Sequence, residues 1–203
     1  MGLLLLGFIA PEGTQFHLPS DLSLQFTMPS SMTRTQADQN ILSVIVDNFF
    51  IVGYTGIFLG AYLYVKEMGY YAKFALIFGL ITSLMDIFEN AMVVAISNSM
   101  VIGFHPDPLL WGLFYSISAL KDISAYISTF TYAILFLISL NYKPAIRLNK
   151  LVFIILLILF AIIGSLGLFS PLFLNLRNIL FVLDLIIASY IFYKTDESIL
   201  NAP

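Results

Sequence analysis

Seven ionisable residues lie in stretches of sequence that otherwise have the composition of membrane-spanning helices. They are Asp47, Asp86, Glu89, Lys121, Asp122, Arg177 and Asp184. A charged side chain in hydrocarbon is costly unless it is paired, hydrated or neutralised, so such residues usually mark ion, proton or substrate sites. Five negative charges against two positive charges leave a formal charge of −3. We therefore expect protons, a bound cation, water or a partner protein to complete the balance.

The densest group of these residues is the segment Asp86-Ile87-Phe88-Glu89-Asn90. Residues three and four positions apart share one face of a helix, so the three polar side chains should project together. Lys121 should lie at a similar depth in the next span, which makes it the natural counter-ion of Asp86 and Glu89. Asp122 should lie on an adjacent flank, because neighbouring residues on a helix point in different directions.

Two other spans add polar groups at helical spacing. Asp47 and Tyr54 are seven residues apart and share a face, with Asn48 beside Asp47. Asp184 and Arg177 show the same spacing, and we expect Arg177 to extend toward the outer interface. The predicted ligand- or proton-binding residues are Asp86, Glu89, Asn90, Lys121, Asp122, Asp47, Asn48, Tyr54, Arg177 and Asp184. The sequence identifies no catalytic residue, metal-ligand set or cofactor motif, and His17 and His105 are interpreted as solvated loop residues.

The composition restricts the class of protein. Of 203 residues, 60% are hydrophobic and 10% are charged, and the mean hydropathy is +0.95. Soluble domains carry about 25% charged residues, so the lipid bilayer is the expected surrounding. The chain has no cysteine, which excludes disulfides and thiolate chemistry, and no basic run indicates a nucleic-acid partner.

Five stretches are long and apolar enough to cross a membrane, which predicts an all-α integral membrane bundle. They comprise residues 41–65, 73–97, 109–141, 151–169 and 172–193. The third is too long for one straight span, so we expect an interfacial turn with Trp111 and Tyr115 at its start. The predicted organisation is an N-terminal apolar segment and loop (1–40), a transmembrane bundle (41–194) and a tail (195–203). Residues 2–10 are too short to span, and suit either a short interfacial helix or the end of a longer apolar element.

Basic residues predict the orientation, because Lys and Arg concentrate in cytoplasmic loops. They occur in the first and third connections and at the C-terminal end, and are absent from residues 97–108. We therefore expect a bacterial inner-membrane protein with its N-terminal segment outside and its C-terminus in the cytoplasm. Gly53, Gly56 and Gly60 predict close helix packing. The fourth span has no charge from 151 to 169 and should face lipid over much of its surface.

The run Asp47…Phe50-Ile51…Tyr54-Thr55, followed by Asp86-x-x-Glu89-Asn90 and Lys121, resembles a group of uncharacterised bacterial multi-span membrane proteins. The resemblance covers residues 43–141. It implies a common intramembrane site but no particular reaction. That group typically has an additional N-terminal span, where this chain shows only the apolar residues 2–10.

These patterns favour a small polytopic membrane protein with an outward-facing acidic cavity. The cavity would bind a proton, a cation or a cationic or amphipathic small molecule, for transport or sensing. The main alternative is a structural or accessory subunit, in which the polar residues fix helix register or dock other membrane subunits or a second copy of the chain. An intramembrane enzyme acting on lipid is the third interpretation, which lacks a recognisable nucleophile–base pair.

Overall fold

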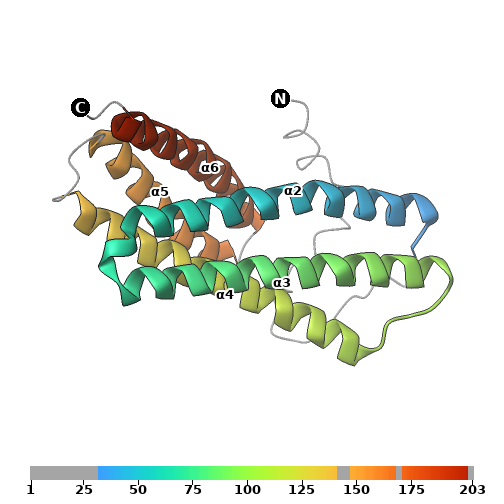
Figure 1. Cartoon of the computed structure of the whole chain (residues 1–203). Coiled ribbons are helices and arrows are strands. Elements are labelled where there is room, and N and C mark those ends of the chain that lie inside the picture. Colours follow the sequence, from blue (N-terminus) through green and yellow to red (C-terminus); the bar gives the residue numbers. More distant parts are fainter. Residues whose placement is uncertain (1–31, 141–146, 168–170, 201–203) are drawn as a thin grey trace.

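The computed structural model describes residues 32–140, 147–167 and 171–200, and these residues are almost entirely helical (Figure 1). The elements are α2 (Arg34–Val65), the 3₁₀ turn η1 (Lys66–Met68), α3 (Tyr70–Val101), α4 (Pro108–Ser139), α5 (Arg147–Gly167) and α6 (Pro171–Leu200). In this part of the chain, five helices are long and apolar enough to cross a membrane. The predicted all-α membrane bundle is confirmed.

Two helices extend beyond their predicted ends. α2 begins at Arg34 because Thr33 and Gln36 form a capping box, in which each side chain bonds the other residue's backbone N–H. α6 continues to Leu200, past the predicted boundary at 194. The expectations for residues 2–10 lie outside the described residues.

The third predicted span is one continuous helix, so the expected interfacial turn at its start is wrong. The Asp107 side chain accepts a hydrogen bond from the backbone N–H of Leu110 at 2.7 Å, and Pro108 occupies the first turn of α4. Proline is favoured there because its missing N–H would have no partner in the helix. Trp111 is only 2% exposed and packs inside the protein.

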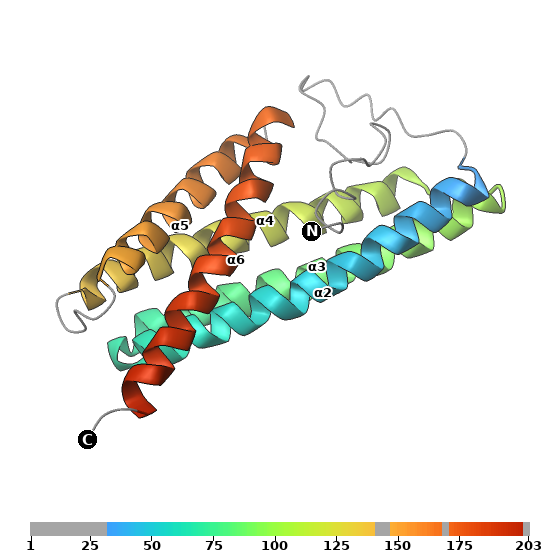
Figure 2. The ribbon, with the colours of Figure 1, turned by 90° about the horizontal axis from the view of Figure 1, so that it is seen from above.

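The helices alternate in direction, and each packs chiefly on its neighbours in the chain. α6 runs back beside α5 and also reaches α2 (Figure 2). There Phe181 packs edge-on against Tyr54. At 1.5 Å per residue, α2, α3 and α4 are each about 48 Å long, whereas α5 is about 32 Å long. The three long helices therefore extend past α5 at the end that carries the α3–α4 connection (Figure 1). We call this the distal end, and the end with the α2–α3 turn the basal end.

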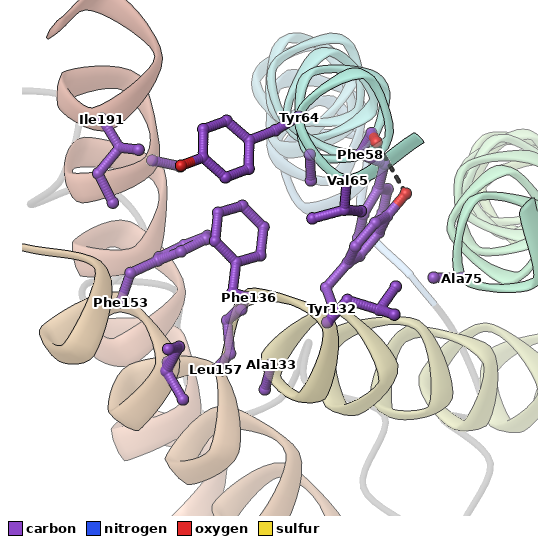
Figure 3. Close-up of a cluster of buried hydrophobic side chains, with 14 of the residues drawn as sticks. Phe58, Tyr64, Val65, Ala75, Tyr132, Ala133, Phe136, Phe153, Leu157 and Ile191 are labelled. Carbon is purple, nitrogen blue, oxygen red and sulfur yellow. Dashed lines mark hydrogen bonds between the residues drawn. The ribbon is translucent and has the colours of Figure 1, made fainter. Parts of the chain in front are cut away.

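Two apolar cores hold the bundle together. The basal core surrounds the stacked rings of Tyr64 and Phe136, whose centroids are 5.0 Å apart, with Phe153 edge-on at 5.2 Å from Phe136 (Figure 3). The Tyr132 hydroxyl in this core donates to the backbone carbonyl of Phe58 at 2.9 Å. The distal core comprises Ile96, Met100, Trp111 and Phe114 from α3 and α4.

The glycines of α2 only partly follow the packing prediction. A Cβ added at Gly60 would lie 2.8 Å from the Phe192 ring, but Gly53 and Gly56 have open space around them. Gly79 on α3, which the prediction missed, lies against Phe58, with 2.6 Å between an added Cβ and the ring. Close contact therefore occurs where α2 meets α6 at Gly60 and α3 at Gly79, and the Gly53–Gly56 surface faces away from the bundle.

α5 buries more of its surface than predicted, since the sequence suggested a span that faces lipid over much of its surface. Phe153, Leu157 and Phe160 are buried, while Ile155 and Ile162 on the other side are about half exposed. Lys150, which the orientation argument places in a loop, is 1% exposed, and its ammonium lies 5.2 Å from the centroid of the Tyr64 ring.

Candidate functional site

Most of the intramembrane charges form one layer between the two apolar cores, on α2, α3, α4 and α6. We call this set the charged layer. Its members are Asp47, Asn48, Tyr54, Asp86, Glu89, Asn90, Lys121, Asp122, Tyr126 and Arg177. Nine of these ten are predicted site residues, and Tyr126 is the addition.

Helix geometry places the charges at a common height. Asp86 is 16 residues from the basal end of α3 at Tyr70, and Lys121 is 18 residues from the basal end of α4 at Ser139. These separations correspond to about 24 and 27 Å. A bilayer's hydrocarbon core is about 30 Å thick, and α5 has about that length. The charged layer therefore lies near the distal end of α5.

Lys121 forms the centre of the layer. Its Nζ atom lies 3.2 Å from Oδ1 of Asp86 and also forms an ion pair with Oε2 of Glu89. The side chains of Lys121, Asp86 and Glu89 are 21%, 10% and 16% exposed, so the group is enclosed but not sealed. The predicted pairing of Lys121 with the two acids of α3 is confirmed.

α2 completes the surroundings of the α3 acids. The Tyr54 hydroxyl donates to Oδ2 of Asp86 at 2.7 Å. One turn further toward the distal end, the Asn90 amide donates to Oδ2 of Asp47 at 2.8 Å and to Oδ1 of Asn48 at 3.1 Å. The i, i+3, i+4 spacing thus places Asp86, Glu89 and Asn90 toward one polar region, in which the two acids share Lys121 and Asn90 bonds to α2.

Arg177 contradicts the expectation that it would extend to the interface. Its guanidinium turns inward, 3.3 Å from Oδ2 of Asp122 on α4, and also donates to the Tyr126 hydroxyl at 3.4 Å. The reason is that the start of α6 faces α4, so a nearby carboxylate replaces water as the partner. Tyr126 lies one turn after Asp122 on α4, and that spacing was the sequence signal for its role.

Asp184 is apart from the layer. It is 7% exposed, and its Oδ1 atom has no hydrogen-bond partner. No ion pair found among the described residues includes it. The structure therefore does not join Asp184 to the other nine predicted residues.

The formal charge of −3 on the seven intramembrane residues can be assigned to particular groups in the fold. Arg177 and Asp122 balance each other, whereas Lys121 faces Asp86 and Glu89. Asp47 has an amide donor but no ion pair within the described part of the chain. The layer thus carries a formal charge of −2, and Asp184 accounts for the third excess negative charge.

A hollow of about 340 Å³ lies elsewhere, between α5 and α6. It is lined by Asn149, Val152, Ile186, Ile187 and Tyr190, none of which is a predicted site residue. Within the ranges that the structure describes, no cluster of three or more His, Cys, Asp or Glu side chains could hold a metal ion.

Comparisons of the chain with protein-family models, with curated proteins and with solved structures found no match.

Proposed function

We propose that the charged layer is the binding site of a small polytopic membrane protein for a proton, a small cation or a cationic small molecule. The observation that carries this proposal is the charge of the layer. The ammonium of Lys121 is shared by Asp86 and Glu89, Asp47 has only an amide donor, and Arg177 is paired with Asp122. An enclosed group with a formal charge of −2 attracts cations or protons strongly, since the surrounding hydrocarbon screens charge poorly.

Lys121 would act as an internal cation in this site. Its ammonium occupies the space between Asp86 and Glu89 that an incoming cation would need. A bound cation would therefore either compete with Lys121 for these carboxylates or bind beside Asp47, where a carboxylate has only an amide donor. Either arrangement makes binding sensitive to protonation of the same acids.

The orientation belongs to this proposal. Lys66, Lys73, Lys150 and Lys194 lie toward the basal end, which favours the basal end as the cytoplasmic side. The charged layer would then open toward the outside of a bacterial inner membrane, with the N-terminal segment outside and the C-terminus inside. Ligand would enter from the distal end, through the outer leaflet boundary, for transport or for sensing.

Thermal unfolding of the purified full-length chain tests the proposal. Unfolding would be followed between pH 5 and 9, and with sodium, potassium, magnesium or methylammonium chloride at constant ionic strength. A ligand at one hundred times its Kd stabilises by about 2.7 kcal/mol. At about 2–4 °C per kcal/mol for a chain of this size, Tm should rise by about 5–10 °C.

Three variants decide the location of the effect. Asp86→Asn and Glu89→Gln keep side-chain shape and should abolish the cation- or pH-dependent rise in Tm. Asp38→Asn is the matched control, because Asp38 is a 56% exposed acid that pairs with Arg34 outside the layer. The proposal is refuted if both layer variants respond to pH and to every cation as the natural chain does.

A structural role is the second candidate, and a specific observation favours it. Each acid of the layer already has a partner within the chain, while α2 presents an open surface around Gly53, with Phe49 75% and Val52 74% exposed. A partner helix could pack closely on such a surface. Mass measurement in mild detergent separates the two roles, because a folded monomer that responds to cations argues against an obligate subunit.

A further inference from the structure

Asp184 is the ionisable group that the charged layer does not use. It lies on α6, ten residues before Lys194 and seven residues after Arg177. These separations correspond to about 15 Å from the basal basic residue and about 10 Å from the layer. The carboxyl group is therefore deep in the hydrocarbon region, at a different height from the other charges.

The groups that face α6 are engaged elsewhere. On α2, the Tyr54 hydroxyl donates to Asp86 and the Tyr64 ring stacks on Phe136. On α5, Lys150 lies over the Tyr64 ring, and on α6 itself Arg177 pairs with Asp122 while Lys194 lies over the Tyr193 ring. On α4, Tyr126 accepts from Arg177. Tyr190, also on α6, is 47% exposed and points away from the buried face that carries Asp184 and Ala188.

Apolar side chains enclose the carboxyl group instead. Ala188, one turn along α6, is fully buried, and Phe181, one turn back, packs against Tyr54 and Phe160. Only 7% of Asp184 is exposed, and its Oδ1 atom receives no hydrogen bond. An isolated carboxylate in such surroundings would lose its hydration without compensation, and buried acids avoid this cost by taking up a proton.

We infer that Asp184 holds a proton as the neutral carboxylic acid, and that it forms a second proton-binding site, separate from the charged layer. Release of this proton would leave an unpaired negative charge between α5, α6 and α2, so it requires water or a cation to enter there. Proton exchange at Asp184 is thereby linked to the packing of α6, whereas exchange in the charged layer is linked to Lys121. The inference does not depend on the proposed cation site.

Infrared difference spectroscopy tests the protonation state directly. A protonated carboxylic acid gives a carbonyl stretch well separated from carboxylate bands. The spectrum of the full-length chain at pH 7 in lipid vesicles should contain this band, and Asp184→Asn should lack it. Asp86→Asn should keep the band, because Asp86 is ion-paired with Lys121.

A hydrophobic carbodiimide tests the protonation state chemically, because its reaction begins with transfer of the acid proton. The acid proton moves to a carbodiimide nitrogen, the carboxylate oxygen adds to the central carbon, and the adduct rearranges to a stable N-acylurea. Mass spectrometry of peptides from the vesicle-bound chain should find this adduct on Asp184 and not on Asp86. A difference spectrum between the natural chain and Asp184→Asn without the carbonyl band would overturn the protonation state.

Discussion

Removal of the Lys121 ammonium is the sharpest test of the charged layer. In Lys121→Met, a side chain of similar length loses its charge, and Asp86 and Glu89 are left facing each other without a cation. Breaking a buried ion pair from one side costs about 3–5 kcal/mol. The three side chains keep 10–21% exposure, so we take the lower end, about 3 kcal/mol. At about 2–4 °C per kcal/mol, Tm should fall by about 6–12 °C.

A neutral triple variant completes this experiment. Lys121→Met combined with Asp86→Asn and Glu89→Gln removes the cation and both charges that it balances, so no unpaired ion remains. Replacing a whole buried ionic group is often close to neutral. The triple variant should therefore recover at least half of the lost Tm, while the Tyr54 hydroxyl can still donate to the amide oxygen at position 86.

Unfolding would be followed by circular dichroism and by fluorescence of Trp111, the only tryptophan, which lies in the distal core. Arg34→Met is the matched control, because Arg34 forms an exposed pair with Asp38 that contributes only about 0.3–0.5 kcal/mol. A triple variant that melts as low as Lys121→Met would refute the charge-balance argument. So would a single variant within about 2 °C of the natural chain.

Two further predictions concern the walls of the layer. Gly164→Ala should lower the free energy of unfolding by about 1–3 kcal/mol, because the added Cβ would lie 2.9 Å from the Tyr126 hydroxyl and closer still to its ring. Gly53→Ala, in open space, should leave Tm unchanged or raise it slightly, and equal effects in the two variants would contradict the described packing. Tyr54→Phe removes the hydrogen bond to Asp86 and should cost about 1.5–3 kcal/mol in denaturant unfolding, a loss that should shrink to about 0.5–1.5 kcal/mol in an Asp86→Asn background, where the acceptor is a neutral amide.

The five helices could be predicted because each has an apolar run of sufficient length, and the structure changes mainly their ends. The ends depend on single polar residues outside the apolar runs. Thr33 with Gln36, and Asp107 before Pro108, are recognisable helix starts in the sequence. Hydropathy alone overlooks them, because capping residues are polar and lower the local average.

The centre of the candidate site was also accessible from the sequence, because contacts on neighbouring helices follow from spacing and depth. Asp86 and Glu89 share a helix face, and Lys121 lies at the matching height on the next helix. Arg177 and Asp184 were harder, because their surroundings depend on the rotation and crossing of α6. That crossing is set by distant contacts such as Phe181 with Tyr54, which no local pattern records.

The contact between Lys121 and the α3 acids also bears on how the chain enters the membrane. Two central acids cost about 5–7 kcal/mol at the translocon, and the twelve Leu, Ile, Val and Phe residues between Phe74 and Ile96 return about 5 kcal/mol. α3 alone is therefore a marginal insertion substrate. Only residues 102–107 separate α3 from α4, and α4 carries Lys121, whose ammonium pairs with the acids of α3. We expect α3 and α4 to leave the translocon together as a hairpin, with the ion pairs formed before either helix meets lipid alone.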